Sequence, residues 1–538
     1  MSDDPIEKIV VLGGGSAGWM AACYLSQAVP GARIELVEAP GIGRIGVGEA
    51  TVPNLQRVFF DYLGIDERTW MSRCNGSYKM AVKFVNWTTP GTPQAQPRTR
   101  ADGYADVFYH PFGILPTHDN LPLSHYWLER WRRGETDLRY DQACFVESAL
   151  MDANAAPRTW DGERAANYAW HFDAQMMADF LQEWATRSGR VKHTLAQMTG
   201  VRRDSRGYIT ALVTDHAGDV EGDLFIDCSG FRGALINQVL GEPFIDQRDY
   251  LLCDSAVARQ VAHDDEDGIE PYTSSFAMDA GWTWKTPLAG RFGTGYVYSS
   301  RYVDDDAALL DFCRLWGLDP TEPVNRIRFR VGRNRRSWVK NCVSIGLASC
   351  FLEPLESSGL YFTYAAIYQL AKHFPSKGNE EVLRNSFNQE IAKMFDDTRD
   401  FVQTHFYYSP RNDTEFWRAN KNLVLSDDLV DRMQRYLAGL PVNVPVAGED
   451  DYYGNFEAEF GNFWTNGSYY AILAGLGLLP ERGLPRLAHT LATGRADSAV
   501  SFERIATKRA ELLGTLPPMH EYLRRLHQPA KDVSAPHG

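Results

Sequence analysis

A glycine-rich turn near the start of the chain places the strongest limit on how it can fold. The stretch KIVVLGGGSAGWMAACYLSQ predicts a buried strand over residues 8–12, a turn and a helix from about Ser16, and RIELVE predicts a second strand over 33–38. The turn has the pattern GxGxxG, formed by Gly13, Gly15 and Gly18. This order of strand, turn and helix predicts a βαβ unit of an α/β fold.

The same residues predict a dinucleotide site. Glycines let the backbone turn tightly and approach a pyrophosphate, and the start of the helix offers free N–H groups to it. Glu38 ends the second strand, 20 residues after Gly18, where a carboxylate can bind a ribose hydroxyl. These features alone leave FAD and NAD open.

A later strand favours FAD. Residues 223–233, DLFIDCSGFRG, predict a strand that ends in a small-residue turn with Asp227, similar to the late nucleotide-side strand of FAD proteins with two dinucleotide folds. Beyond residue 50 the sequence has no further GxGxxG that could mark a separate nicotinamide site. A flavoprotein without its own nicotinamide site receives reduced flavin from another protein, so the sequence predicts such a partner.

The rest of the chain predicts a mixed α/β (α+β) architecture. Residues 77–87 alternate like one strand, with Lys79 and Lys83 on one face, and residues 88–106 predict a surface loop. A β-meander is expected from about residue 208, followed by antiparallel strands. After Gly359 the pattern becomes helical, with apolar residues on one face of a long helix at Leu383, Phe387, Ile391, Met394, Phe395 and Val402.

Charge and composition limit the partners. With 538 residues and a formal net charge of −14, the averaged surface repels nucleic acid and anionic membranes. The sequence lacks a run of 18 apolar residues and a basic leader, which predicts a cytoplasmic protein. The eight cysteines have no CxxC or Cys/His spacing, so neither a metal site nor a disulfide framework is expected. The basic stretch 326–340 predicts a solvated strand and turn, with an anion-binding or docking patch as the alternative.

Several longer stretches resemble the flavin-dependent tryptophan halogenases. The resemblance extends from Ile9 to about Leu526 and is greatest to the tryptophan 6-halogenase branch. It is carried by GGGSAGWMAA, RIGVGEATVPNLQRVFFDYLGI, YKMAVKFVNW, FYHPFG, WTWKTP, NCVSIGLASCFLEPLESSGLYF and FEAEFGNFWTNGSYY. One departure is Thr286, which stands where the family pattern WxWxIP has isoleucine.

The resemblance implies an FAD-binding box similar to that of aromatic hydroxylases, joined to a mainly helical module that binds tryptophan. The box takes residues 1–100 and 160–358, the helical module takes 101–159 and 359–527, and 528–538 form a flexible tail. The implied cofactors are FAD as FADH2, O2, and chloride or bromide. The implied partners are L-tryptophan and a separate NAD(P)H-dependent flavin reductase, in antibiotic biosynthesis. The sequence leaves the oligomeric state open and allows a homodimer.

The implied chemistry assigns two catalytic residues. A flavin C4a-hydroperoxide gives hypohalous acid, which reaches Lys79 through a tunnel and either hydrogen-bonds the lysine or forms a haloamine on it. Glu356 then stabilises the arenium ion and takes its proton. Periodicity does not choose between Lys79 and Lys83, nor between Glu353 and Glu356; the resemblance makes these choices and leaves Glu353 structural. Burial is expected to lower the pKa of Lys79, and a nearby carboxylate to oppose that.

The resemblance also assigns the binding residues. FAD contacts are implied for Gly13, Gly15, Ser16, Ala17, Gly18, Glu38, Ala39, Ile42, Ile45, Val47, Glu49, Ala50, Met198, Leu347 and Leu360. Chloride is implied at the amides of Ser358 and Gly359, in a small-residue turn before a helix, where serine capping is the alternative. Substrate contacts are implied for Pro53, His110, Phe112, Tyr452, Tyr453, Glu459, Phe463, Trp464 and Ser468.

Five positions favour reaction at indole C6. They are Val52, Val82, Ser358, Gly467 and Ser468, where 7-halogenating relatives carry Ile, Ile, Thr, Ser and Asn. Smaller side chains let the indole shift, at about 1 to 3 kcal/mol for each change. A tryptophan 7-halogenase is the alternative.

Two other classes of protein remain open. An FAD-dependent aromatic hydroxylase shares the GxGxxG and Glu38, but such enzymes carry a Gly-Asp pair after the late strand, whereas this chain has Leu347 after Gly346. A non-catalytic flavin-binding protein would leave the pairing of Lys79 with Glu356 unexplained.

Overall fold

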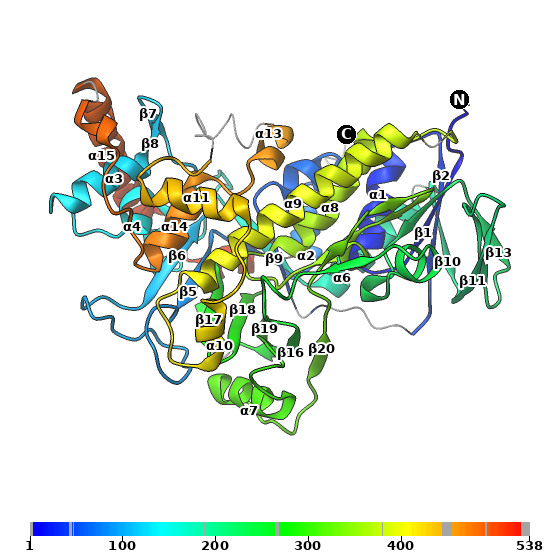
Figure 1. Ribbon diagram of the computed structural model, residues 1–538, viewed down its shortest axis with the longest axis horizontal. Helices are drawn as coiled ribbons and strands as arrows, with labels where there is room; N and C mark the ends of the chain where they lie inside the picture. The colour runs from blue at the N-terminus through cyan, green and yellow to red at the C-terminus, as the bar shows by residue number, and fades with distance from the viewer. Residues whose placement is uncertain are drawn as a thin grey trace, which may run out of the picture.

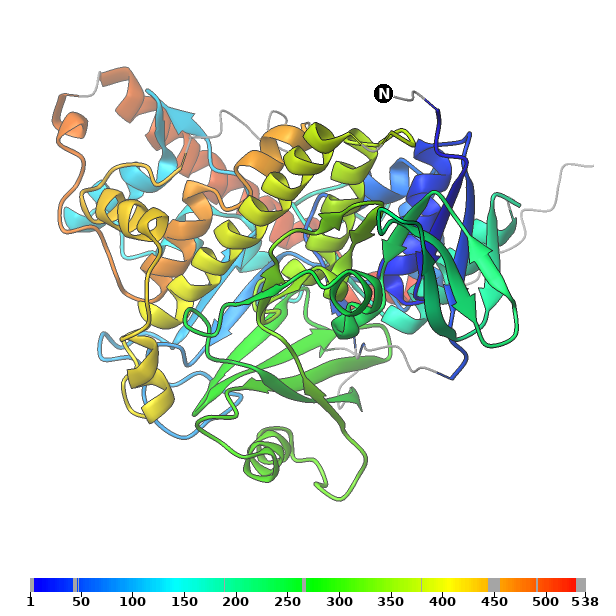
Figure 2. The same cartoon turned by 45° about the vertical axis from the view of Figure 1, so that its right-hand side comes forward.

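Helices dominate one end of the molecule, strands and several helices together make up the rest, and a long helix runs between the two regions (Figures 1 and 2). The computed structural model describes residues 4–41, 46, 48–187, 189–263, 268–378, 380–443, 455–489 and 492–528. The long helix is α9 (Glu381–Tyr407), and the helices at the far end include α11 (Asp427–Leu437), α14 (Asn466–Gly475) and α15 (Ala492–Thr515). The predicted mixed α/β architecture is confirmed.

The first sheet contains the glycine turn. Its strand order is β10 (Val191–Leu195), β2 (Arg33–Glu38), β1 (Lys8–Leu12), β14 (Leu224–Asp227), β23 (Cys342–Ser344) and β22 (Trp338–Val339). The pairs from β10 to β23 are parallel, and β22 pairs antiparallel with β23. The two strands and the helix start predicted around the turn are confirmed, and the helix is α1 (Ser16–Ala28).

The second sheet combines strands from the middle of the sequence with two strands, β5 (Ala81–Val85) and β6 (Val107–Pro111), from its first quarter. Its order is β20 (Asn325–Arg328), β16 (Ser255–Ala262), β19 (Arg291–Tyr298), β18 (Gly281–Pro287), β17 (Thr273–Met278), β5 and β6. The predicted meander is also present, as β11 (Met198–Arg203), β12 (Ile209–Thr214) and β13 (Asp219–Glu221).

The prediction of one strand over 77–87 is wrong. The chain forms β4 (Ser77–Lys79), in a small sheet with β9 (Ala169–Phe172) and β3 (Glu49–Ala50), and then enters the second sheet as β5. The break falls at Met80, whose N–H donates to the Pro271 carbonyl and whose carbonyl accepts from the Phe112 N–H. Lys79 and Lys83 therefore lie on different strands.

A continuous core joins the sheets to the helices. One hydrophobic cluster contains residues from Ile6 to Leu526. Helix α8 (Ser358–Lys372) contacts both α1 and α9. Five of the six apolar residues predicted to share one face of α9 are buried, namely Phe387, Ile391, Met394, Phe395 and Val402. This confirms the helix and its packing face.

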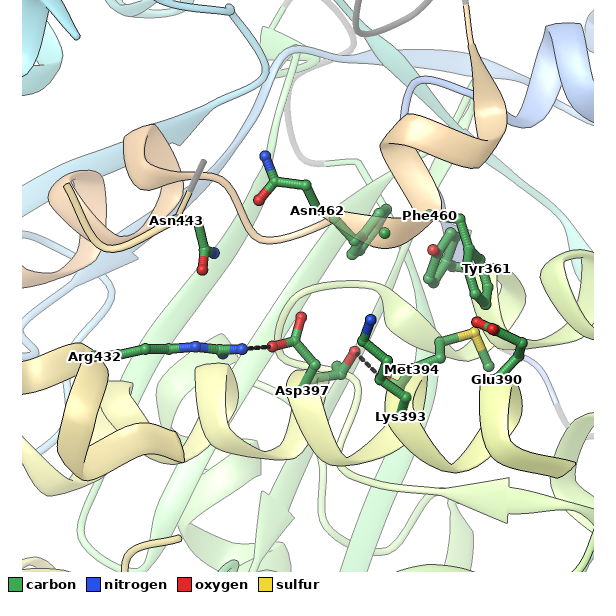
Figure 3. Close-up of a pocket in the computed structure, with 12 residues that line it drawn as sticks. Tyr361, Glu390, Lys393, Met394, Asp397, Arg432, Asn443, Phe460 and Asn462 are labelled. Atoms are coloured by element: carbon green, nitrogen blue, oxygen red, sulfur yellow. Dashed lines mark hydrogen bonds and ion pairs between the residues drawn. The ribbon is translucent and has the colours of Figure 1, made fainter. Parts of the chain in front are cut away.

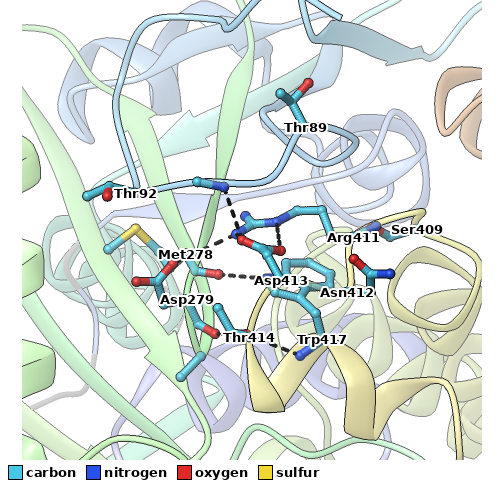
Figure 4. Close-up of polar contacts among 12 residues, drawn as sticks. Thr89, Thr92, Met278, Asp279, Ser409, Arg411, Asn412, Asp413, Thr414 and Trp417 are labelled. Carbon is cyan, nitrogen blue, oxygen red and sulfur yellow. Dashed lines mark hydrogen bonds and ion pairs between the residues drawn. The ribbon is translucent and has the colours of Figure 1, made fainter. Parts of the chain in front are cut away.

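A buried arginine ties the end of α9 to the second sheet. Arg411 lies between Asp413 and Asp279, and its guanidinium is 4.9 Å from the Trp417 ring (Figure 4). Thr414 Oγ1 donates to the carbonyl of Asp279 at 2.7 Å, in the turn between β17 and β18. These contacts fix the connection between α9 and α10 (Glu415–Asn420).

The basic stretch 326–340 is a network of ion pairs rather than an open patch. Its pairs are Arg326 with Asp306, Arg328 with Asp305, Arg333 with Asp396, and Arg335 and Arg336 with Glu242. Among the helices described, none has the length and apolar character needed to cross a membrane.

Candidate active site

The glycine turn fits a pyrophosphate. Gly13 has φ +118°, and a Cβ there would lie 2.3 Å from the Cys228 carbonyl oxygen, so a side chain cannot be accommodated. Gly15 precedes α1 and has no side-chain cap, and no atom lies within 4 Å of the position of a Cβ on it. The open space beside Gly15 and the first N–H groups of α1 suit the phosphates of a dinucleotide.

Two of the other regions assigned to FAD, Glu38 and the turn at Gly346, pack against the glycine turn and the helix start. Glu38 contacts His193 Nε2 at 3.0 Å through Oε2, and its carboxyl lies directly against Gly14. The Gly346 turn, which Leu347 follows, packs against the Ala17 side chain at the start of α1. Ser16 and Gly18 lie in that first turn, Ala39 follows β2, Met198 begins β11, and Leu360 lies in the first turn of α8.

The segment 39–50 is described only in part. Ile42, Ile45 and Val47 lie outside the described residues, whereas Glu49 and Ala50 form β3. Burial, and the charge of Asp173, raise the pKa of Glu49 to about 7. A half-buried carboxyl with a pKa near neutrality thus lies in the segment assigned to the flavin.

Lys79 is completely buried at the end of β4. Its Nζ donates to the Thr51 carbonyl at 2.9 Å and to Ser357 Oγ at 2.7 Å, and it lies 5.0 Å from the Phe112 ring centroid. Burial lowers the pKa of Lys79 to about 7, although the charge of Glu356 raises it. A neutral amine has two N–H bonds for these two acceptors and keeps a free lone pair.

Glu356 is held between two histidines. Its Oε2 is 3.0 Å from His110 Nδ1, its Oε1 is 2.8 Å from His405 Nε2, and all three side chains are buried. Burial by itself would raise the pKa of Glu356, but the charge and hydrogen bond of His110 and those of His405 lower it to about 2. The carboxylate is therefore ionised at neutral pH.

His405 was not predicted from the sequence. Its Nδ1 lies 2.8 Å from the Phe401 carbonyl, which can only accept, so Nδ1 carries a proton and a second proton lies between Nε2 and Glu356. The signal that could have found His405 is helical spacing. It stands four residues after Phe401 and three after Val402, on the apolar face of α9, where a histidine requires polar partners.

Ser357 was predicted only as part of a turn, but it contacts Lys79. It precedes α8 with φ 60°, in the left-handed region, and its side chain makes no capping hydrogen bond. This conformation costs about 1 to 3 kcal/mol in a residue other than glycine. It turns Ser357 toward Lys79 while the preceding Glu356 contacts the histidines.

The start of α8 fits a small anion. Ser358 Oγ is buried without a partner among the described residues, and no atom lies within 4 Å of the position of a Cβ on Gly359. The first N–H groups of this 15-residue helix carry no side-chain cap from Ser357. Ser358 and Gly359 could therefore hold chloride.

Glu353, the other candidate acid, faces a different neighbour. Its Oε2 accepts from Trp282 Nε1 at 2.7 Å. Burial raises the pKa of Glu353 to about 8, against hydrogen bonds from Trp282 and Cys253. Glu353 is thus neutral near pH 7 and fixes the ring of Trp282, in keeping with the structural role expected for it.

Aromatic side chains gather beside Lys79 and Glu356. His110 lies 6.4 Å from Trp464 between ring centroids. Two aromatic residues that the sequence did not suggest support the group: Phe401 stacks on Trp464 at 4.1 Å, and Tyr361 stacks on Phe463 at 3.8 Å. Such faces suit a flat indole.

Glu459 is a buried carboxyl on α13 (Phe456–Gly461). Its Oε1 accepts from Asn54 Nδ2 at 2.6 Å, whereas Oε2 is buried with no partner in the described part of the chain. Burial raises the pKa of Glu459 to about 8, against the charge of Arg57 and the hydrogen bond from Asn54. Tyr452 and Tyr453 lie outside the described residues.

A pocket of about 60 Å³ adjoins the aromatic group. Its lining includes Tyr361 and Phe463. Figure 3 shows Arg432, on α11, extending toward Asp397 on α9, with which it forms an ion pair. The remaining lining residues are Glu390, Lys393, Met394, Thr398, Asn443, Phe460, Gly461 and Asn462. The pocket is therefore lined by residues of α8, α9, α11 and α13 and of the loops beside them.

The five regiochemical positions lie in three places. Val52 directly follows Thr51, and Val82 pairs with His110 across β5 and β6, so both lie next to partners of Lys79 or Glu356. Ser358 begins α8. The other two lie in the first turn of α14, where the Gly467 carbonyl accepts from Tyr140 OH and the Ser468 N–H donates to Thr465. Pro53, between Val52 and Asn54, is half-buried.

Comparisons with known proteins decide the family. A family model described as tryptophan halogenase matches residues 8–492. The chain belongs to the tryptophan halogenase family. Tryptophan 6-halogenase ThaL of Streptomyces albogriseolus is 59% identical over 528 residues, which are 98% of this chain and 99% of that protein. Tryptophan 7-halogenase RebH of Lentzea aerocolonigenes is 55% identical over 527 residues, 97% of this chain and 99% of its own.

A solved structure supports the same assignment. Tryptophan 6-halogenase SttH from Streptomyces toxytricini superposes with a TM-score of 0.85 at 40% identity, covering 96% of this halogenase and 99% of its own chain. The enzyme is therefore a tryptophan halogenase, in a family that uses flavin and halide. Because similar relatives include both 6- and 7-halogenases, they leave the position of the halogen undecided.

Proposed function

We propose that this halogenase chlorinates free L-tryptophan at indole C6, using FADH2, O2 and chloride, with bromide as an alternative halide. The observation that carries the proposal is the junction at residues 356–357. Glu356 is ionised between two histidines, and the next residue, Ser357, holds the amine of Lys79. A nucleophilic amine and a carboxylate base thus face one buried, aromatic-lined site.

The chain's own residues would act in sequence. When bound, reduced flavin with O2 and halide supplies hypohalous acid. The Ser358 and Gly359 amides hold the halide, and the free lone pair of Lys79 takes chlorine from hypochlorous acid. An N–Cl bond forms as the O–Cl bond breaks, and the amine gives one proton to the departing hydroxide, which leaves as water. Indole C6 then attacks the chlorine and the N–Cl bond breaks. The C6 proton passes to Glu356 and from there to Nζ, which restores the amine.

Two further features belong to the proposal. A separate NAD(P)H-dependent flavin reductase supplies FADH2, because the sequence has no GxGxxG beyond residue 50 that could mark a nicotinamide site. The FAD box spans residues 1–100 and 160–358, and a tryptophan-binding module spans 101–159 and 359–527. In support, the glycine turn and its strands fall in the first set and α9, α13 and α14 in the second.

Small side chains support position 6. Val52 and Val82 adjoin partners of Lys79 and Glu356. Each is smaller than the isoleucine of 7-halogenating relatives, which leaves room near the reacting carbon. The 59% identity to a tryptophan 6-halogenase agrees with this choice, and the 55% identity to a 7-halogenase keeps the other isomer as the alternative.

The test is product analysis. The purified enzyme, reduced FAD, L-tryptophan and chloride should give monochlorotryptophan with the chlorine isotope pattern in mass spectrometry, and NMR should place chlorine on C6. Lys79→Ala and Glu356→Gln should keep FAD binding but lose most chlorination, whereas Lys83→Met, a change in the neighbouring lysine, should retain it. A 7-chloro product would overturn the position, and hydroxytryptophan would overturn the reaction.

A further inference from the structure

A chain of hydrogen bonds runs from α8 to the buried carboxyl of Glu459. Tyr364 OH donates to Asn54 Oδ1, and Asn54 Nδ2 donates to Glu459 Oε1 at 2.6 Å. All three side chains are buried. Because the tyrosine hydroxyl donates to the amide oxygen, the amide NH2 must face Glu459. Tyr364 therefore sets the orientation of Asn54, and Asn54 sets that of the carboxyl.

This arrangement leaves one carboxyl oxygen available. Glu459 Oε1 is taken by Asn54, whereas Oε2 is buried and has no partner within the described ranges. An unpaired buried carboxyl oxygen is costly. Among the residues described, Glu353 Oε1 is unpaired as well, but Glu459 lies near Tyr361 of the aromatic group, where a cationic group of a bound ligand would pair with it. Under the proposed function, that group is the ammonium of tryptophan.

The same short segment also holds the reacting lysine. The Thr51 carbonyl accepts from Lys79 Nζ, three residues before Asn54. Thr51 is fixed to β9: its N–H and Oγ1 both donate to the Trp170 carbonyl, and Oγ1 accepts from the Trp170 N–H. The Asn54 carbonyl then accepts from the Val58 N–H at 2.9 Å. One rigid segment thus links the ammonium end of the site to the chlorinating end.

We infer that Asn54 is a positioning residue that sets the distance from the Glu459 carboxylate to Lys79, and thereby determines which indole carbon meets the lysine. The inference rests on the proposed function. Tryptophan has few rotatable bonds between its ammonium and its ring, so a shift of the anchor moves the ring edge. Asn54 would touch neither the indole nor the reacting atoms, and it would act through its hydrogen bond to Glu459.

The test compares two substrates in two variants. Asn54→Leu keeps the shape but removes both hydrogen bonds, and Tyr364→Phe removes only the bond that orients the amide. L-tryptophan and 3-(indol-3-yl)propanoate, which lacks the ammonium, are assayed for KM, kcat and isomer ratio. Asn54→Leu should raise the KM for tryptophan about tenfold, leave that for the propanoate unchanged and increase the minor chloro isomer. Tyr364→Phe should change the same quantities less.

Matched controls are buried residues of the same type elsewhere. Asn420→Leu removes a donor to the Phe416 carbonyl, and Tyr436→Phe removes a donor to the Leu478 carbonyl. Neither variant should change the ratio of the KM for tryptophan to the KM for the propanoate, and neither should change the ratio of the chlorotryptophan isomers.

Three results would overturn the inference. The first is an unchanged KM and isomer ratio in Asn54→Leu, and the second is an equal rise in KM for both substrates with FAD binding retained. The third, if Asn54→Leu does not fold, is an unchanged KM and isomer ratio in Tyr364→Phe. Failure of the proposed function is seen separately, as absence of chlorination by the wild-type enzyme. Calorimetric titration of tryptophan into wild type and variants would still report the role of Asn54 in that case.

Discussion

Lys79 Nζ donates a hydrogen bond to Ser357 Oγ at 2.7 Å, so the lysine is held by the residue that directly follows Glu356 in the chain. The contact depends on the left-handed backbone of Ser357 and on the burial of Lys79. Lysine and carboxylate are therefore placed by one turn at the start of α8. Their protonation states differ because their neighbours differ: histidines hold Glu356 ionised, whereas burial favours a neutral Lys79.

The rate of chlorine transfer should rise with pH. Below its pKa of about 7, Lys79 is an ammonium without a lone pair, and above it the amine can accept chlorine. The single-turnover rate of chlorotryptophan formation, measured by rapid quench from premixed reduced enzyme, should increase through pH 7 and then level off. A rate that falls as pH rises through this value would instead favour the ammonium as a hydrogen-bond donor. Lys79→Arg, which stays charged, should be slow and lack the rise.

His405 should keep Glu356 ionised at low pH. In His405→Leu the carboxylate loses one hydrogen bond and one positive charge, and burial then raises its pKa from about 2. Activity should therefore decline at a higher pH on the acid side than in wild type. The pH profile of kcat measures this directly.

A second histidine provides the control for that experiment. His373 Nδ1 also lies 2.8 Å from the carbonyl of the residue four positions earlier, and its Nε2 contacts Ser386. His373→Leu removes similar local contacts without touching Glu356, so the acid limb of its pH profile should match wild type. Equal shifts of the acid limb in both variants would show that His405 does not set the pKa of Glu356.

Tryptophan affinity should rise as pH rises toward 8. Glu459 has a pKa of about 8 because it is buried, so below that pH the empty site holds a neutral carboxyl that must lose a proton to pair with an ammonium. KM for tryptophan should fall with increasing pH up to about 8. Glu459→Gln should abolish this slope, and so should the use of 3-(indol-3-yl)propanoate. A slope that survives both changes would exclude Glu459 as the ammonium partner.

The sequence predicted those elements whose pattern is local. The glycine turn and the apolar runs around it predicted β1 and β2 with their bounds and the start of α1, and the apolar period predicted α9. Both signals depend on local backbone conformation and on burial of a single face. Family resemblance, rather than pattern, selected Lys79 and Glu356.

The parts that failed depend on tertiary contacts. Residues 77–87 alternate correctly for a strand, yet the chain changes sheet at Met80 because Pro271 and Phe112 supply its hydrogen bonds. His405 and Asn54 lie 49 and 405 residues from the carboxylates that they contact, so nothing local could indicate those pairs. The left-handed φ of Ser357 was equally hidden, because serine rarely adopts it.

Arg411 should be the largest single contributor to stability among the polar side chains of Figure 4. Its side chain is 0% exposed and pairs with Asp413 at 2.7 Å, so Arg411→Met leaves that carboxylate partly buried without its charge partner. Removal of one member of a buried pair costs about 3 to 5 kcal/mol in the free energy of unfolding. Arg435→Met, which removes an exposed pair with Asp431 on α11, should cost about 0.3 to 0.5 kcal/mol. Urea unfolding of both variants measures the difference, and equal losses would show that Arg411 is no anchor between α9 and the second sheet.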